Sequence, residues 1–369
     1  MSIYDKLSVK KVINASFCLT VLGGSKLPQE TLDAMVAANE SFVEIADLED
    51  KAGKILSEIT GAEAAFVTSG AFNAFVLAAA ACIAGNDPIL MMKLPHTEGM
   101  KNEILIQANL RSIFDRSIQT PGGVTVEVGT KEHGCTELEL EEAINVKTAA
   151  IHYIPALDPP RTDVLSLEKV IEIGHRKGVP IIVDAAGQTY PLERVSMFTD
   201  MGADLVCYSG KYFQGPNSTG FVCGKKELVE AVKANSFIGS GGCKIGRGYK
   251  LDRQEIVALI IAVQRWMELD HEEVRFKPAR EKQSYIVSSL GDIPGVLAES
   301  QPYSYHTMGL RLTFDKTAEE TAELVGKMRS GDPSIWLRRR RENTVLMNTL
   351  FLDDGDEKVI VERLKELLL

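Results

Sequence analysis

The chain has 369 residues and a formal net charge of −10. This acidic balance argues against a nucleic-acid or anionic-membrane partner, because either would need a basic face. Hydrophobic residues make up 45% and charged residues 25% of the chain, a composition typical of a globular protein, and the length predicts one large domain and a smaller one. The basic run Arg338–Arg341 is interpreted as a solvated or ion-paired edge.

The six cysteines include no CxxC pair, so we expect neither a metal site nor a redox motif. Several of them lie in apolar stretches, where a free thiol behaves as a small hydrophobic group, and this fits a reducing cytoplasm. No signal peptide is predicted at the N-terminus, and no apolar run reaches the length that spans a bilayer. We therefore expect a cytoplasmic protein with no membrane partner.

The predicted elements begin with an extended segment over 12–15, a helix over 28–46 and a second helix over 50–60. A buried strand over 64–67 then leads through Thr68-Ser69-Gly70-Ala71 into a helix that runs to position 82. Further strands are predicted over 88–92, 148–153, 179–183, 203–208 and 220–224, and helices over 136–146 and 166–177. This alternation predicts an α/β fold with a mostly parallel sheet.

Four chemically useful side chains follow the predicted strands. Ser69, His96, Asp184 and Lys211 each come at or just after a strand end. Ligands on such sheets bind beyond the carboxyl ends of the strands. We therefore expect these residues to lie near one ligand site.

Each of these residues also has a purely structural interpretation. Ser69 could be an ordinary helix N-cap, although a strand, Ser-Gly and a helix also form an anion site. Lys211 could point into water, although a desolvated amine is a nucleophile near neutral pH. Asp184 could cap a helix or form an ion pair, and His96 could be structural.

The C-terminal third has a different pattern. A glycine-rich, basic loop over 235–250 contains Lys244, Arg247 and Lys250, and a long apolar helix is predicted over 252–269. Strands over 309–314 and 344–352 and helices over 318–329 and 357–369 indicate a small α+β domain. The predicted domains are an N-terminal segment (1–45) that contributes to the active site and the small domain, a large domain (46–265) and the small domain (266–369).

Several motifs together resemble a known family. They are Val12-Ile13-Asn14-Ala15, Leu22-Gly23-Gly24-Ser25, Thr60-Gly61-Ala62-Glu63-Ala64, Val67-Thr68-Ser69-Gly70-Ala71, Val183-Asp184-Ala185-Ala186-Gly187-Gln188, Tyr208-Ser209-Gly210-Lys211 with Gly215-Pro216, and Gly246-Arg247. The chain resembles the fold-type I pyridoxal-phosphate enzymes of the aminotransferase class V-like superfamily. It is most similar to the group that contains selenocysteine synthase and D-glucosaminate-6-phosphate ammonia-lyase.

The resemblance implies roles for particular residues. Lys211 is the Schiff-base lysine, and Asp184 is the partner of the pyridine nitrogen of pyridoxal 5'-phosphate. Ser69, Gly70, Ala71 and Ser209 hold the phosphate, and His96 is a candidate for stacking on the ring. Arg161, Lys244 and Arg247 are candidates for binding a substrate carboxylate or phosphate, with surface ion pairs as the alternative. Phe72 and Asn73 depart from the family, which usually has small residues there.

The resemblance also implies a homodimer or larger homo-oligomer and an amino-acid or amino-sugar-acid substrate. We expect an ammonia-lyase acting on a 3-hydroxy amino acid, with D-glucosaminate 6-phosphate as the candidate. Racemisation, transamination, aldol cleavage and replacement at Cβ, including selenium transfer, remain alternatives, as does a non-catalytic member of the fold. Selenium transfer is disfavoured because the shared region starts about nine residues into the chain, leaving no room for a tRNA-binding domain, and because the charge is acidic.

Overall fold

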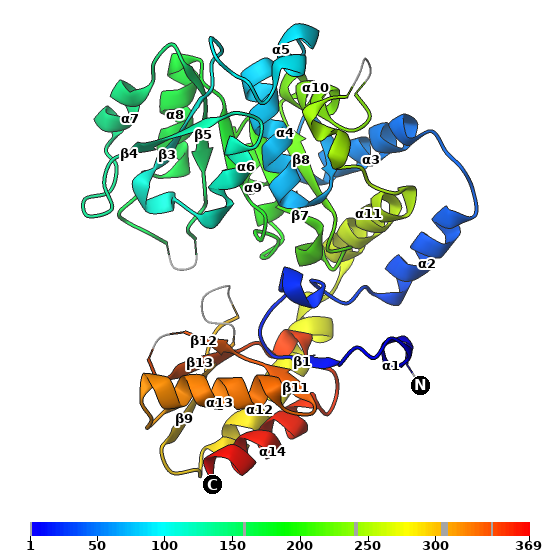
Figure 1. Ribbon diagram of the computed structural model, residues 1–369, viewed down its shortest axis with the longest axis vertical. Helices are drawn as coiled ribbons and strands as arrows, with labels where there is room; N and C mark the ends of the chain where they lie inside the picture. Colours follow the sequence, from blue (N-terminus) through cyan, green and yellow to red (C-terminus); the bar gives the residue numbers. More distant parts are fainter. Residues whose placement is uncertain (1, 158–159, 240–242, 304–308, 341) are drawn as a thin grey trace. The chain divides into compact units, whose positions relative to one another are not determined.

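The computed structural model describes residues 2–157, 160–239, 243–303, 309–340 and 342–369 (Figure 1). The chain divides into two compact units. The smaller contains Met1–Gly24 and Glu268–Leu369, and the larger contains Ser25–Met267. Across the described residues, no helix combines the length and the apolar character needed to cross a membrane.

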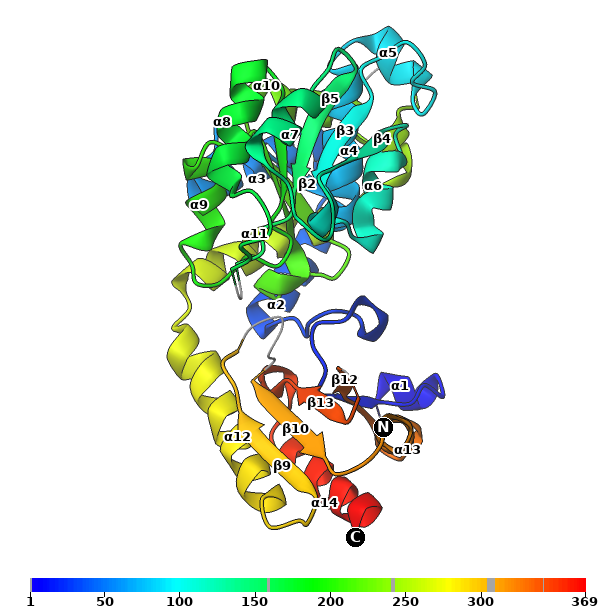
Figure 2. The same ribbon diagram turned by 90° about the vertical axis from the view of Figure 1, so that its left-hand side faces the viewer.

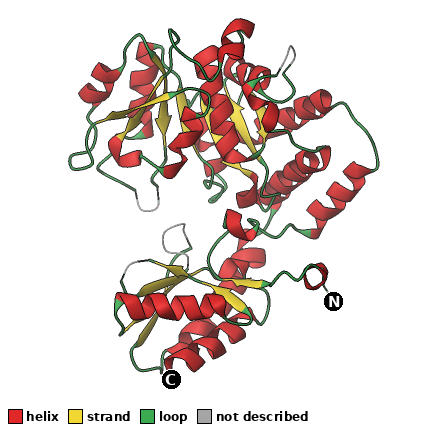
Figure 3. Cartoon of the chain, in the orientation of Figure 1, coloured by secondary structure: helices red, strands yellow, loops and turns green. Residues whose placement is uncertain are grey.

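A seven-stranded sheet forms the centre of the larger unit in the described chain, and Figure 3 draws its strands in yellow. The strand order is β2-β8-β7-β6-β5-β3-β4. β8 runs antiparallel to both of its neighbours, and the pairs from β7 to β4 are parallel. The predicted α/β fold with a mostly parallel sheet is therefore confirmed. The strands are β2 (Ala64–Thr68), β3 (Glu103–Gln107), β4 (Val124–Val128), β5 (Thr148–Tyr153), β6 (Ile181–Asp184), β7 (Leu205–Ser209) and β8 (Gly220–Gly224).

Helices cover both faces of this sheet, as Figure 2 shows for α8 and α9 on one side and α4 and α6 on the other. Two apolar clusters separate accordingly, one around α3, α8, α9 and α11 and the other around α4 and α10. The helices of this unit are α2 (Gln29–Asn39), α3 (Ile45–Thr60), α4 (Gly70–Ala84), α5 (Pro88–Lys93), α6 (Arg116–Gln119), α7 (Glu137–Ala143), α8 (Leu167–Lys177), α9 (Arg194–Asp200), α10 (Lys226–Asn235) and α11 (Arg253–Glu268).

Local signals explain where several helices begin and end. Ser166 caps α8 by accepting from the Lys169 amide, and Gly178 ends the helix in a left-handed conformation. Gly61 ends α3 in the same way. These boundaries agree with the sequence-based prediction.

Some predicted elements are wrong. The strand expected over 88–92 is helix α5, because Asp87 accepts hydrogen bonds from the Ile89 and Leu90 amides and Pro88 occupies the first turn. The helix expected over 28–46 ends at Asn39, and α3 starts already at Ile45. Strands β3 and β4 were not predicted.

The smaller unit contains a four-stranded antiparallel sheet with order β12-β13-β10-β9, and β1 pairs in parallel with β11. Leu310, Leu312 and Phe314 alternate with less buried residues along β10 and enter its core. The elements are α1 (Ile3–Lys6), β1 (Val12–Asn14), α12 (Lys277–Leu290), β9 (Val296–Ser300), β10 (Leu310–Phe314), α13 (Ala318–Ser330), β11 (Ser334–Trp336), β12 (Arg338–Arg339), β13 (Thr344–Met347) and α14 (Asp356–Leu368).

The first two residues of the basic run lie on an edge strand of this small sheet. Arg338 and Arg339 form β12, which pairs only with β13 in the described sheet. The Arg339 guanidinium donates to the Ala318 carbonyl at 2.9 Å. Arg341, like Asp158, Pro159, Gly241 and Gly242 of the predicted loops, is outside the described residues.

Candidate active site

The turn from β2 into α4 has the geometry of an anion site. Ser69 occupies the N-cap position of the 15-residue helix, but its side chain makes no capping hydrogen bond. The first amides of a helix lack intrahelical partners and carry a positive partial charge. Gly70 adopts φ +80°, a conformation that other residues rarely reach. The turn therefore presents backbone donors and a hydroxyl group to a ligand.

Asn73 orders this turn. Its amide nitrogen donates to the Ser69 hydroxyl oxygen at 2.9 Å and to the Ser69 carbonyl at 2.7 Å. The Ser69 hydroxyl proton thus remains available for a ligand, because the oxygen acts as the acceptor. Asn73 departs from the family pattern in the sequence, and its contact with Ser69 gives that departure a structural role.

Strand register brings three strand ends together beside this turn. Gly220 of β8 is paired with Thr68 of β2 on one side and with Ser209 of β7 on the other. A Cβ on Gly220 would lie 2.7 Å from the Gly70 carbonyl carbon and 2.8 Å from the Ala71 nitrogen. Only glycine allows this close approach. Ser209 therefore lies at the same edge as the Ser69-Gly70-Ala71 turn, as an anion site needs.

Asp184 ends β6, next to Cys207 of β7 in the strand register. One carboxylate oxygen accepts from the Ala186 amide at 3.1 Å, and no other hydrogen bond to this carboxylate is found in the described chain. Burial raises the pKa of Asp184 to about 6; the Ala186 hydrogen bond opposes this rise and the negative charge of Asp115 adds to it. A positively charged ligand atom beside Asp184 would lower its pKa and complete its hydrogen bonding.

Lys211 lies in a loop that closes on itself directly after β7. The Gly210 amide donates to the Thr219 carbonyl at 2.8 Å, and the Gly215 amide donates to the Gly210 carbonyl at 2.9 Å. A Cβ on Gly210 would lie 2.2 Å from the Thr219 hydroxyl oxygen, so the loop requires glycine there. Lys211 itself belongs to a short 3₁₀ turn, Gly210–Phe213. The closed loop fixes the backbone that carries the lysine.

The loops after β6 and β7 also hold one another. The Ser209 amide donates to the Ala186 carbonyl at 3.2 Å, and the Thr189 hydroxyl donates to the Tyr212 carbonyl at 3.3 Å. A Cβ on Gly187 would contact the Tyr212 ring at 3.4 Å, and the Lys211 amine lies 5.2 Å from the centre of that ring. The loops that carry Asp184 and Lys211 are thus locked together.

Ser25 and Tyr212 were not predicted from the sequence as parts of this site. The Ser25 hydroxyl donates to the Lys211 carbonyl at 2.9 Å, and Tyr212 provides the ring beside the lysine amine. Ser25 belongs to the Leu22-Gly23-Gly24-Ser25 motif, so the motif was visible but its contact was not. Tyr212 adjoins Lys211 in sequence, yet only the turn shows that its ring lies near the amine.

His96 is not brought to this group. It is exposed and follows helix α5, with its amide donating to the Lys93 carbonyl at 2.8 Å. The adjacent Thr97 donates to the Gly122 carbonyl, just before β4 begins. This loop therefore lies at the amino ends of the parallel strands, whereas Asp184 and Lys211 follow carboxyl ends.

The three basic candidates for substrate binding differ in their surroundings. Arg161 forms an ion pair with Asp163 and donates to the Asn109 carbonyl at 2.8 Å, and the Asp163 side chain raises the pKa of Arg161. Lys244 is buried, whereas Arg247 is exposed on the turn Ile245–Gly248. That turn packs against α4, since a Cβ on Gly246 would lie 2.8 Å from Leu77.

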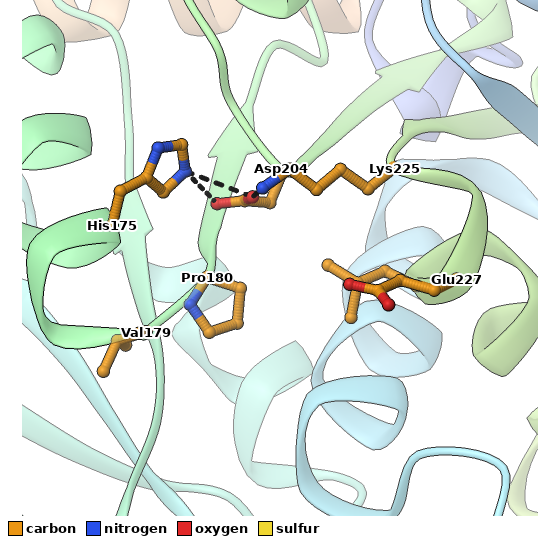
Figure 4. A pocket seen from close by; sticks show the side chains of 8 residues that line it. His175, Val179, Pro180, Asp204, Lys225 and Glu227 are labelled. Atoms are coloured by element: carbon orange, nitrogen blue, oxygen red, sulfur yellow. Dashed lines mark hydrogen bonds and ion pairs between the residues drawn. The ribbon is translucent and has the colours of Figure 1, made fainter.

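A cavity of about 470 Å³ opens at the opposite edge of the sheet (Figure 4). The buried carboxylate of Asp204 lies at its wall and binds the His175 ring at 3.0 Å, the Lys225 amine at 2.6 Å and the Ile181 amide at 2.8 Å. The His175 ring and the Lys225 amine both point toward Asp204 in the figure. Because its carboxylate is already bound by these groups, we assign Asp204 a structural role.

The residues at the carboxyl edge fit pyridoxal 5'-phosphate. The Ser69-Gly70-Ala71 turn and Ser209 offer donors for its phosphate, and Asp184 offers a carboxylate oxygen for its ring nitrogen. Lys211 offers an amine for its aldehyde. The chemical fit rests on the incompletely bonded Asp184 and on the uncapped start of α4.

Known proteins resemble the chain over its whole length. The family model for aminotransferase class-V matches residues 64–307. D-glucosaminate-6-phosphate ammonia lyase of Salmonella typhimurium is 29% identical over 99% of this chain and 98% of that protein. The 5'-C-glycyluridine monooxygenase-decarboxylase of a Streptomyces species is 32% identical over 99% and 92%.

More distant and structural matches agree. L-seryl-tRNA(Sec) selenium transferase of Aquifex aeolicus is 26% identical over 98% of this chain and 85% of that protein. A solved structure of D-glucosaminate-6-phosphate ammonia-lyase superposes with a TM-score of 0.87 at 29% identity, covering 100% of this chain and 98% of that one.

Proposed function

Since the chain belongs to the aminotransferase class-V family and uses pyridoxal 5'-phosphate as its cofactor, we propose that it is an ammonia-lyase. The reaction eliminates water from a 2-amino-3-hydroxy acid, and hydrolysis of the resulting enamine by water then releases ammonia and gives a 2-keto-3-deoxy acid. We propose D-glucosaminate 6-phosphate as the substrate. The main support is the full-length likeness to the lyase of that name, in sequence and in fold.

Each site residue has a separate role in this reaction. When bound, the cofactor links to an amine and accepts the electron pair left when a bond at the α-carbon breaks. The Lys211 amine takes the α-proton and then returns a proton, to the departing 3-hydroxyl group or to C3. Asp184 holds the ring nitrogen in its protonated state. Ser69, Gly70, Ala71 and Ser209 bind the phosphate.

Substrate anions require further cations. Lys244, Arg247 and Arg161 remain our candidates for the substrate carboxylate and phosphate. Lys244 is supported by its burial next to the turn that packs on α4. Arg161 already binds Asp163, so its use would require exchange of that partner.

The test is direct. Purified protein loaded with the cofactor is mixed with D-glucosaminate 6-phosphate, and keto acid and ammonia are measured. We expect equal amounts of both, with neither product from the Lys211→Ala variant. Lys226 is exposed at the start of α10, outside the loop after β7. The control variant Lys226→Ala should therefore retain activity.

Failure of this assay would reject the lyase reaction but not the cofactor. A loaded enzyme that makes no keto acid yet racemises, transaminates, cleaves or replaces a group on another amino acid would support the alternatives. A chain that takes up no cofactor would be a non-catalytic member of the fold.

A second candidate reaction is oxidative decarboxylation. It is favoured by the 32% identity to the monooxygenase-decarboxylase over 92% of that protein. Oxygen consumption and carbon dioxide release are measured with 5'-C-glycyluridine. Oxygen uptake that depends on this substrate, together with no ammonia from D-glucosaminate 6-phosphate, would replace the lyase proposal.

We also propose that the chain forms a homodimer or larger homo-oligomer in the cytoplasm. Phe42 is 94% exposed, and Val36 and Val43, near it in the sequence, are exposed as well. An isolated chain would leave these apolar side chains in water. The described cysteines are free thiols, which suits a reducing compartment. Sedimentation of the wild type should give at least twice the monomer mass, and Phe42→Asp should reduce it; a monomeric wild type would reject self-association.

A further inference from the structure

His152 is a buried histidine that the proposed reaction does not use. It lies on β5 with 3% of its surface exposed, and its ring stacks on Phe75 of α4 at 5.2 Å. Neither ring nitrogen has a hydrogen-bond partner in the described part of the chain. Leaving buried polar atoms without hydrogen-bond partners costs free energy. We therefore expect a hydrogen-bond partner for these nitrogens when the cofactor is bound.

Strand register places His152 beside Asp184. His152 is paired with Ile182 of β6, and Asp184 follows Ile182 by two residues. Residues two apart on a strand share a face, and both Ile182 and Phe75 belong to the apolar cluster around α4. The His152 and Asp184 side chains therefore project from the same face, at diagonal positions with α-carbons about 8 Å apart.

One neighbouring charge acts on both side chains. The carboxylate of Asp115, which is bound by Arg111, raises the pKa of Asp184 and opposes the lowering of the pKa of His152. Burial is the main cause of that lowering, to about 4. A neutral imidazole has one N–H to donate and brings no cation that would compete with the cofactor for Asp184.

We propose that His152 is a positioning residue for Asp184, whose carboxylate it holds by an imidazole N–H hydrogen bond through one bridging water, while Asp184 binds the cofactor's ring nitrogen. Ala186 holds one oxygen of the carboxylate, and His152 restrains its remaining rotation. This inference rests on the cofactor and on Asp184, but it does not depend on which substrate is used.

The test uses the full-length apoprotein and two ligands. His152→Phe keeps the ring that stacks on Phe75 and removes both nitrogens. We expect it to weaken binding of pyridoxal 5'-phosphate about tenfold, but to leave binding of 1-deazapyridoxal 5'-phosphate, which has no ring nitrogen, unchanged. His152→Gln, with an amide donor, should restore most of the lost affinity. Equal weakening of both ligands would mean that His152 only packs, and no weakening would also overturn the proposal.

A second measurement does not need the Phe variant to fold. In protein labelled with [¹⁵N]histidine, the His152 imidazole resonance is identified by its absence from His152→Gln. It should shift when pyridoxal 5'-phosphate is added to the wild type, but not when it is added to Asp184→Ala. A resonance that is the same in both proteins with and without the cofactor would contradict the role. Wild type that binds no pyridoxal 5'-phosphate would instead refute the cofactor itself.

Discussion

Asp184 and Asp204 are acids of the same sheet with opposite surroundings, Asp204 buried and Asp184 half-buried. Asp204 precedes β7 and is held by His175, Lys225 and the Ile181 amide. Asp184 ends β6 at the other edge and accepts from Ala186 alone in the described structure. The protein itself supplies the partners of the Asp204 carboxylate, whereas among the described residues no cation is bound to Asp184.

The difference separates a structural acid from a ligand-binding acid. Burial without a charged partner is costly, so a protein that retains such a group gains by binding something to it. Asp184 is next to the locked Lys211 loop and on the same edge as the Ser69 turn. Asp204 lines a cavity (Figure 4), but its carboxylate is already bound by His175, Lys225 and the Ile181 amide.

Neutralising Asp184 is the most severe test of the difference between the two acids. Asp184→Asn keeps the side-chain shape but cannot hold the ring nitrogen protonated. We expect turnover to fall by about a hundredfold or more, with the unfolding midpoint changed little or raised. Steady-state kinetics and urea denaturation of the same preparations test this. Full activity in Asp184→Asn would show that Asp184 is not the cofactor's partner.

The matching change at the other edge is Asp204→Ala. It leaves His175 and Lys225 without their acid and the Ile181 amide without its acceptor. Because both side chains reach solvent and can be hydrated, we expect a loss of about 2 kcal/mol in the free energy of unfolding. Cofactor affinity should be unchanged in the folded protein. A large loss of cofactor affinity at unchanged stability would contradict the structural role.

Gly220→Ala tests whether the Ser69-Gly70-Ala71 turn binds the phosphate. The added methyl group would press on the Gly70-Ala71 peptide and on the Tyr208 carbonyl, at 2.5 to 2.8 Å. We expect a destabilisation of about 1 to 2 kcal/mol and weaker cofactor binding. Gly326→Ala, where no neighbour lies within 4 Å of the new Cβ, is the control and should not affect binding. Unaltered affinity in Gly220→Ala would argue that the turn does not bind the phosphate.

The smallest expected effect is on pH dependence. Asp184 has a pKa raised to about 6 in the folded apoprotein, from 3.8, so between these values the folded state holds more protons. The apoprotein therefore loses stability as pH rises from 3.8 to about 6, by at most about 1.4 kcal/mol per pH unit. The wild-type minus Asp184→Asn difference in unfolding free energy should fall over this window and then level off. A flat difference would mean that Asp184 is ordinarily solvated.

Much of the fold and part of the site follow from local sequence. Strand-helix alternation predicted the sheet, and Ser166, Gly178 and Gly61 marked helix ends that the structure confirms. Ser69, Asp184 and Lys211 were placed just after strands, where the structure has them, although their chemical roles stay predictions. Asp87-Pro88 is a helix-start signal, and it outweighs the apolar run that follows it. This is why the strand predicted over 88–92 is a helix.

The remaining features depend on pairing between distant segments. The row formed by Thr68, Gly220 and Ser209 needs β8 to insert antiparallel between β2 and β7, which chain order does not specify. His152 lies in an apolar strand, and its incomplete bonding appears only when β5, β6 and α4 are assembled. His96, in contrast, was placed by a predicted strand that proved to be a helix.

The central claim is that Lys211 binds the cofactor covalently at an edge that Asp184 completes. Protein loaded with pyridoxal 5'-phosphate is reduced with borohydride, digested and mapped by mass spectrometry. We predict one modified peptide that carries the reduced cofactor on Lys211, and no such peptide from Lys211→Ala. Modification of another lysine, or none at all with the wild type saturated by cofactor, would contradict the account.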